Sequence, residues 1–174
     1  MIKGMADQVM PTAKCAMVAT ALGKSVNDYS AEHDGKLPSA DDWITELAPY
    51  YAKQVKKFTT KNGEKLSDNP FVGSMFPDTT LKGPVQCVMT DTSKTELVFN
   101  ADLSNAIEKE IKNAGETPLF FEVNASWPIK AMPSKDRPTG KGPKIMNEAR
   151  DWMVIFADGK MKDPSGKEID INVE

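Results

Sequence analysis

The sequence is poor in the residues that build most catalytic and metal-binding sites. Its 174 residues contain one histidine and two cysteines, Cys15 and Cys87, which are far apart in the chain. A zinc site needs three or four closely spaced ligands, and a redox pair needs a C-x-x-C motif. Neither pattern occurs, so we expect no bound metal and no cofactor. The lone histidine, His33, has no partner at a defined spacing and is expected at the surface.

Motifs of the common enzyme classes are also missing. The GKGP segment at 140–143 lacks the spacing of a phosphate-binding loop, and its proline removes a backbone donor that such a loop needs. No G-x-S-x-G nucleophile motif occurs. The adjacent carboxylates Asp41 and Asp42 would point about 100° apart on a helix, which indicates a solvated helical turn. We expect no enzyme and no small-molecule substrate.

Long apolar runs and a strong charge of one sign are absent too. No window approaches the roughly 18 consecutive apolar residues of a membrane-spanning helix, and the first ten residues are too polar for a signal peptide. The net charge of −3 argues against a dedicated nucleic-acid-binding protein. The 40% hydrophobic and 27% charged residues are typical of a globular chain, and the length predicts one domain over 1–174.

The first part of the chain is predicted to be helical over 12–33. Apolar residues recur there at steps of three and four, which places them in one stripe of a helix. They are Cys15, Val18, Leu22, Val26 and Tyr29. Asp34-Gly35 is expected to end this helix, because glycine adopts the left-handed conformation of a helix C-terminus at little cost.

A second helix is predicted over 39–52. Ser39 and Asp42 form an approximate capping box at its start. Its apolar face is marked at positions i, i+4 and i+7 by Trp43, Leu47 and Tyr50. The basic residues that suit its C-terminal turn are Lys53, Lys56 and Lys57. The glycines and prolines between 59 and 84 predict loops.

From residue 85 the pattern becomes strand-like. Apolar or alternating runs predict strands over 85–90, 95–100, 117–123, 152–157 and 168–173. Asp158-Gly159 is a strong hairpin signal, and a short helix over 103–113 is expected inside the sheet region. Helices followed by strands predict an α+β fold, in which an N-terminal helix packs on an antiparallel sheet within 85–174, with short additional helices and long loops.

The segment 126–150 is rich in proline and in basic residues. It is too long for an ordinary connection, which indicates either an interaction loop or a partly mobile one. The residues that we expect at an interaction surface are Lys53, Lys56, Lys57, Trp127, Lys130, Lys135, Arg137 and Lys141. Either these charges are simply solvated, or they attract another copy of the chain or an anionic partner.

The order of these features resembles the type IV pilin-like (pseudopilin) superfamily. The resemblance rests on four segments: 13–38 with YSAEHDGKLP, 43–50 with LAPY, VFNADLSNAIEKEIKNAGETPLFFE at 98–122, and 152–162 with VIFADG. More narrowly, the chain is similar to bacterial prepilin-type secreted proteins that end in a Phe-Ala-Asp-Gly hairpin. Together the segments touch most of the chain outside the two loop regions.

The resemblance implies a non-enzymatic structural subunit of a type IV pilus or a type II secretion system. Such a domain would lie in the bacterial periplasm or at the cell surface. Its partners would be other pilin-like subunits or the secretion machinery, with a homo-oligomer in the full-length form. Members of the superfamily begin with a leader and an apolar helix half that anchors them in the membrane. This chain lacks both and looks like the soluble domain.

The resemblance also implies a disulfide bond. Similar chains often have cysteines at the positions of Cys15 and Cys87, although the second lacks its usual following proline here. Proteins outside the cytoplasm favour such bonds, and closing this loop would stabilise the fold by about 4 kcal/mol in the chain-entropy model. The alternative is two buried thiols that behave as small hydrophobic groups.

Some secretion pseudopilins hold calcium near the end of the sheet. Here oxygen ligands could come from Asp158, Asp163 or Asp170. Their spacing does not match a dedicated calcium loop, so no calcium site is expected.

Two other functions are open. A stand-alone secreted or surface module could bind a glycan or a protein, with Trp127 either as a stacking platform or as a buried structural residue. A DNA-capturing minor pilin is the third hypothesis. The basic segments permit it, but no aromatic residues alternate with the lysines as stacking on a single strand requires. Nucleic acid is therefore not an expected partner.

Overall fold

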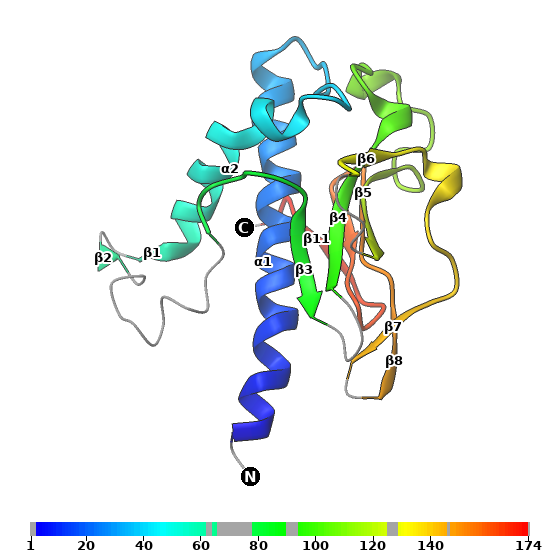
Figure 1. Ribbon diagram of the computed structural model, residues 1–174. Coiled ribbons are helices and arrows are strands. Elements are labelled where there is room, and N and C mark those ends of the chain that lie inside the picture. The colour runs from blue at the N-terminus through cyan, green and yellow to red at the C-terminus, as the bar shows by residue number, and fades with distance from the viewer. Residues whose placement is uncertain are drawn as a thin grey trace.

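Two helices pack beside an antiparallel sheet in the computed structural model (Figure 1). The structure describes residues 3–61, 64–65, 78–89, 94–124, 129–145 and 147–173. Helix α1 (Lys3–Glu32) forms the long axis of the molecule, and α2 (Trp43–Thr59) runs back beside it. The predicted α+β class, with helices on an antiparallel sheet, is confirmed.

Helix α1 begins at Lys3, so the predicted start at residue 12 is wrong. Pro11 removes only one backbone donor, and the neighbouring alanines, methionines and glutamine are good helix formers, so the helix continues across it. The predicted end is confirmed. Asp34 and Gly35 have positive φ angles of 55° and 78°, and the Gly35 N–H donates to the Ser30 carbonyl at 2.8 Å.

The apolar stripe of α1 faces the core as predicted. Its five members are between 0 and 7% exposed: Cys15, Val18, Leu22, Val26 and Tyr29. Gly23 lets the helix approach the end of the sheet closely, because a Cβ at this position would lie 2.1 Å from the Cδ1 atom of Ile171. The small residues of α1 therefore set the distance between the helix and the sheet.

Helix α2 differs from its prediction at both ends. It begins at Trp43, after a turn in which the Asp42 N–H donates to the Ser39 hydroxyl at 3.0 Å. It ends at Thr59 because lysines are good helix formers and buried Val55 continues the apolar row. Tyr51, at 2% exposure, lies in the core, and the predicted Tyr50 is partly buried and packs against the same cluster. The Tyr50 hydroxyl donates to Glu32 at 2.7 Å.

The main sheet has the strand order β11-β10-β9-β5-β4-β3, and all these neighbours are antiparallel. The strands are β3 (Val85–Met89), β4 (Lys94–Asn100), β5 (Pro118–Asn124), β9 (Val154–Phe156), β10 (Lys160–Lys162) and β11 (Glu168–Asp170). The predicted strands at 85–90, 95–100, 117–123 and 152–157 are thus confirmed, with shifts of one or two residues at their ends. The strand predicted over 168–173 ends at Asp170, because a turn follows at 171–172. The Asp158-Gly159 hairpin joins β9 to β10, with a φ of 82° at the glycine, and β11 is an edge strand as expected.

Each face of this sheet has its own apolar cluster. The face toward α1, here called the inner face, carries Leu97, Phe99, Phe120, Ile155 and Met161. Trp43 at the start of α2 packs edge-on against Phe120, with 5.2 Å between the ring centroids. The opposite, outer face carries a smaller cluster of Val98, Phe121, Val123 and Val154. Adjacent residues of β4 from Leu97 to Phe99 alternate between the two clusters, as do Phe120 and Phe121 of β5, as the pleat of a strand requires.

The predicted helix over 103–113 is wrong. Two short 3-10 turns occur instead, η2 (Ala101–Leu103) and η3 (Glu108–Glu110). Asn105 and Asn113 have positive φ angles of 58° and 53°, which a helix does not tolerate. The backbone between the turns pairs with the loop after α1, where the Leu37 N–H donates to the Ala106 carbonyl at 2.8 Å.

The segment 126–150 is more ordered than a loop where the structure describes it. It contains β6 (Ala131–Met132), which pairs parallel to β4, the turn η4 (Ser134–Asp136), and the hairpin β7 (Lys141–Ile145) and β8 (Glu148–Asp151). The Asp102 carboxylate accepts the Ser134 N–H at 2.8 Å and its hydroxyl at 2.6 Å, which fixes η4 to the main sheet region. A further short hairpin, β1 (Thr60–Lys61) and β2 (Glu64–Lys65), follows α2.

Candidate interaction surface

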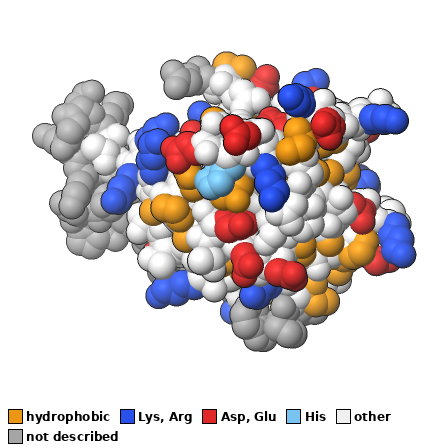
Figure 2. Space-filling view, turned by 90° about the horizontal axis from the view of Figure 1, so that it is seen from above, with side chains coloured by type: hydrophobic (Ala, Val, Ile, Leu, Met, Phe, Trp, Pro, Cys, Tyr) orange, Lys and Arg blue, Asp and Glu red, His pale blue; other side chains and the backbone are white. Residues whose placement is uncertain are grey.

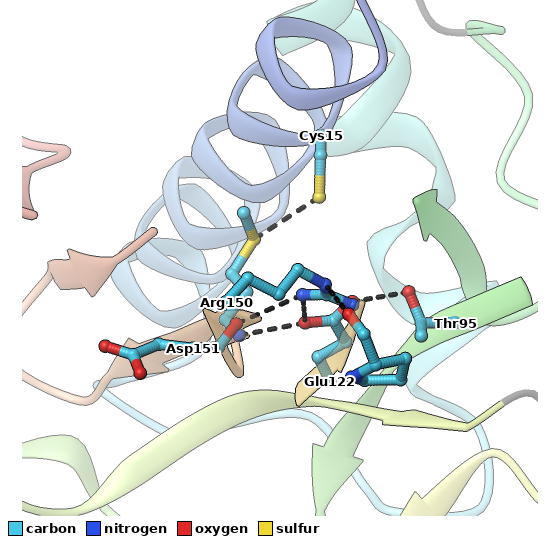
Figure 3. Close-up of polar contacts among 7 residues, drawn as sticks. Cys15, Thr95, Glu122, Arg150 and Asp151 are labelled. Carbon is cyan, nitrogen blue, oxygen red and sulfur yellow. Dashed lines mark hydrogen bonds and ion pairs between the residues drawn. The ribbon is translucent and has the colours of Figure 1, made fainter. Parts of the chain in front are cut away.

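A buried ion pair attaches the β7–β8 hairpin to the main sheet (Figure 3). Arg150 of β8 is bidentate on Glu122 of β5, with Nη2 2.7 Å from Oε1 and Nη1 2.8 Å from Oε2. The side chains are 6% and 0% exposed. Sequence reasoning missed this pair, although a single carboxylate inside the apolar run 118–123 needs a cation or a donor when that run is buried.

The remaining polar atoms of this pair are also satisfied. The Thr95 hydroxyl donates to Glu122, as does the Met153 N–H at 2.9 Å. The Nε atom of Arg150 donates to the Pro143 carbonyl at 2.8 Å. A network with all its partners rigidifies the segment that carries it, whereas removing one partner leaves a buried charge. The pair therefore holds the hairpin in one position on the sheet.

Cys15 lies next to this network, on the inner side of α1. Its sulfur is 3.5 Å from the Met153 sulfur (Figure 3), its side chain is 0% exposed, and it is disulfide-bonded. Cys87, the other cysteine of the chain, lies in β3, and α1 packs against β3. The side chain of Cys87 is outside the described part of the chain, so the pairing of Cys15 with Cys87 stays a prediction.

The predicted lysines of α2 form an exposed basic row. Lys53, Lys56 and Lys57 all point to solvent, and Lys53 lies 3.9 Å from the Asp28 carboxylate. Three lysines on one helix flank, with one weak ion pair among them, are consistent with a solvated face as well as with an interaction surface.

The second predicted basic group lies in the segment from β6 to β7. Lys130, Lys135 and Lys141 are exposed, and Arg137 is half-buried. The C-terminal half of α2 and the β7–β8 hairpin lie on opposite sides of the molecule (Figure 1), so the structure does not bring the two basic groups together. Trp127 lies outside the described residues.

A groove opens beside Arg137 on the outer face of the sheet. It encloses about 270 Å³ and lies between the turn at 137–140 and strands β9 and β10. Its lining includes Arg137, Pro138, Trp152, Val154, Phe156 and Lys162. We call it the outer groove. Of these residues, sequence reasoning identified only Arg137, because the others come from separate strands whose pairing was needed to bring them together.

The charges at the rim of the outer groove are partly neutralised. Asp151 accepts Lys141 Nζ at 2.7 Å, and Lys162 Nζ lies 3.4 Å from its other oxygen. The hydrogen bond and charge of Lys141 hold the pKa of Asp151 below its ordinary value, assisted by Lys162. Arg137 has no ion pair or side-chain hydrogen bond within the described ranges.

A second cavity of about 310 Å³ lies between α1, α2 and the strand β3. Val18, Tyr51, Asp78, Leu81 and Lys82 are among its lining residues. Burial raises the pKa of Tyr51 above its ordinary value, and the nearby Asp78 adds to this effect.

The end of the molecule where α1 stops carries His33, which is exposed as predicted (Figure 2, pale blue). Its ring stacks on Tyr29 at 3.9 Å between centroids, and its Nδ1 lies 2.8 Å from the Tyr29 carbonyl oxygen. Acidic side chains surround it in the space-filling view. The hydrogen bond to Glu32 raises the pKa of Tyr50 to about 12.

Each of the three aspartates considered as calcium ligands accepts a hydrogen bond from the backbone two residues further along its own turn. Asp158 accepts the Lys160 N–H, Asp163 accepts the Ser165 N–H, and Asp170 accepts the Asn172 N–H. No group of three histidine, cysteine or carboxylate side chains in the described part of the chain is placed to hold a metal ion. Nor does any helix within that part combine the length and apolar character that a membrane crossing would require.

Comparison with known proteins adds no assignment. No model of a known protein family matches the sequence, and no curated protein or solved structure is significantly similar to it.

Proposed function

We propose that this chain is a non-enzymatic structural subunit, the globular domain of a type IV pilin-like or type II secretion pseudopilin protein in the bacterial periplasm or at the cell surface. It would act by packing against other pilin-like subunits or the secretion machinery, and a full-length form would assemble into a homo-oligomer. The resemblance in sequence order is the starting point, and the arrangement of α1 is the observation that carries the proposal.

Helix α1 has two parts, one that packs on the sheet and one that extends beyond it. From Cys15 to Ser30 it supplies a buried stripe to the inner face of the sheet. Its first turns extend beyond β3 and away from the sheet (Figure 1). A helix end that extends beyond the sheet offers backbone length for packing against a neighbouring helix.

The rest of the molecule suits a packing role. The helix and the inner face share one apolar core, so α1 is rigidly attached to the domain that it would carry. The exposed lysines at the flank of α2 would lie at the rim of contacts, where charges affect association rate and salt dependence more than affinity. Oxidation of Cys15 to a disulfide is consistent with a location outside the cytoplasm.

The decisive experiment measures the intact mass and N-terminal sequence of the protein as its native cell makes it. We expect a processed apolar extension preceding residue 12. A mature chain that begins at Met1 contradicts the proposal, because it leaves no apolar helix half for assembly.

A photo-crosslinking residue tests the packing directly in that cell. At Asp7, in the extended part of α1, we expect crosslinks between copies of this chain or to other pilin-like subunits. The matched position is Lys94, which is exposed at the start of β4. Equal crosslinking from both positions would contradict a special role for the helix end.

The second candidate, a stand-alone module that binds a protein or a glycan, is favoured by the outer groove. Retention of ligand binding by a chain without any apolar extension would support it. DNA capture is the weakest candidate, because the two basic groups lie on opposite sides of the molecule and do not form one stripe. Retardation of DNA at low salt would support DNA capture if it is lost when either of the two basic groups is removed.

A further inference from the structure

We propose that the outer groove binds a peptide segment of a partner protein that carries a carboxylate beside an apolar side chain. This inference goes beyond the packing role above, because the groove lies on the sheet face opposite α1 and involves neither helix. It would operate in a filament subunit and in a stand-alone module alike.

Arg137 supplies the group that recognises the carboxylate. Arg137 lines the groove, is half-buried, and its side chain has no hydrogen-bond or ion-pair partner among the described residues. A guanidinium carries five donors in a planar fork that matches the two oxygens of a carboxylate. Partial burial strengthens such a charge-assisted hydrogen bond relative to one at a fully exposed lysine.

The other charged residues of the groove do not neutralise Arg137. Asp151 is the carboxylate in the lining, and it is already bound by Lys141 at 2.7 Å and Lys162 at 3.4 Å. These two cations more than compensate its charge. With Arg137 added, the groove has an excess of positive charge and is complementary to an anionic ligand.

Apolar side chains contribute to the lining of the groove. Phe156 is partly buried and packs beside the outer cluster, Val154 belongs to that cluster, and Pro138 also lines the groove. An aliphatic side chain placed against the exposed parts of Phe156 and Pro138 would remove apolar surface from water on both sides. The cavity of about 270 Å³ has room for one or two side chains, which is less than an extended polymer would need.

These features favour a peptide over a sugar. A glycan site typically presents an open aromatic face, but the Trp152 ring has the Arg150 guanidinium 5.9 Å from its centroid. Its Nε1 atom is buried and has no acceptor in the described part of the chain, so this donor is not presented to a ligand. The Glu122–Arg150 pair fixes the segment next to Trp152, so the groove is largely formed before binding.

The test is an NMR titration that follows the indole N–H signal of Trp152, assigned by its disappearance in Trp152→Phe. The probes are N-acetyl-leucyl-aspartyl amide and, as the uncharged match, N-acetyl-leucyl-asparaginyl amide. We expect a saturable shift with the acidic peptide at millimolar concentration. Binding should be at least about tenfold weaker for the uncharged peptide and for Arg137→Gln, since a charge-assisted hydrogen bond is lost in each.

Lys135→Gln is the matched control, because it removes an exposed cation two positions away that does not line the groove. It should leave the titration unchanged, which separates the groove from general electrostatic attraction. Equal shifts with both peptides, no shift with either, or equal losses in Arg137→Gln and Lys135→Gln would overturn the proposal. A shift with glucuronate but with neither peptide would assign the groove to an acidic sugar and would equally overturn it.

Discussion

The two faces of the main sheet are covered in different ways. The inner face is covered by α1 and α2, whose apolar residues join it in one large cluster. The outer face has a small apolar cluster and is covered by the segment around β6–β8. That segment is positioned by a few polar contacts, namely the β6–β4 pairing, the Asp102–Ser134 hydrogen bonds and, on the inner-face side of β5, the Glu122–Arg150 pair.

The difference shows how one sheet can combine a rigid core with an accessible surface. Apolar contacts on the inner face are numerous and form one continuous core. The segment that covers the outer face is held by a few specific polar contacts, so removing one of them is expected to loosen the whole segment. A binding groove is found on the outer side, where the cover is incomplete.

The largest expected effect comes from comparing two adjacent residues on opposite faces. Phe120→Ala and Phe121→Ala each remove a fully buried ring, the first from the inner cluster and the second from the outer one. We expect losses of unfolding free energy of about 5 and about 3 kcal/mol, because the larger cluster closes the cavity less easily. Urea unfolding of both variants measures the difference, and equal losses would remove the distinction between the faces.

Breaking the buried Glu122–Arg150 ion pair should cause the next largest loss of unfolding free energy. Arg150→Met leaves the fully buried Glu122 carboxylate without its cation and should cost about 3 kcal/mol. The double variant Glu122→Leu with Arg150→Met removes both charges and should recover most of that loss. If the double variant is as unstable as the single one, the pair contributes through something other than charge compensation.

Replacing Glu96 on the outer face should have a smaller effect on the unfolding free energy, and of the opposite sign. Burial raises the pKa of its carboxyl above the ordinary value, and its Oε2 has no hydrogen-bond partner in the described part of the chain. The protonated form is thus favoured in the folded state. The Glu96 carboxyl therefore favours the folded state most at a pH below its pKa in the unfolded chain. This contribution to stability is lost as the pH rises through its pKa in the folded protein.

Glu96→Gln removes the buried charge and should stabilise the protein by about 1 kcal/mol at pH 7. At pH about 4, where the carboxyl is largely protonated in both states, the change should be much smaller. Thermal unfolding at the two pH values measures this. A variant that is destabilised equally at both would show that the carboxylate makes a favourable contact.

The smallest effect is expected at the exposed lysines of α2. Lys56→Gln should change the unfolding free energy by less than about 0.5 kcal/mol, since the side chain is exposed and forms no ion pair within the described part of the chain. Sedimentation at two salt concentrations would show whether it changes association. A clear loss of stability would mean that this flank is part of the fold and not a solvated surface.

Periodicity predicted the parts of the fold that depend on local pattern. The stripe from Cys15 to Tyr29, the main strands and the Asp158-Gly159 hairpin all follow from the steps of three and four, the apolar runs and the glycine in the turn. The errors lie where distant backbone segments compete with local propensity. Residues 103–113 form no α-helix because Ala106 pairs with Leu37, and Tyr51 is more deeply buried than Tyr50, which packs against the same core.

The candidate site was less predictable than the fold. Arg137 was identified from its basic segment, whereas Asp151, Trp152, Val154, Phe156 and Lys162 join it only when β9 and β10 lie beside the turn at 137–140. The same holds for Glu122 and Arg150, whose partnership spans 28 positions. No local rule pairs such residues.

The sequence by itself therefore determined which segments form helices and strands and which of their faces are buried. The apolar periods of helix and strand are visible in residues that are neighbours in the chain. It also determined that the chemistry available is limited, with a single histidine and two cysteines. Tertiary structure decided where the proline-rich segment lies, which charges are buried together and where a groove remains open. These three features depend on contacts between residues far apart in the chain. Such contacts stabilise the fold only after the strands of the sheet have paired.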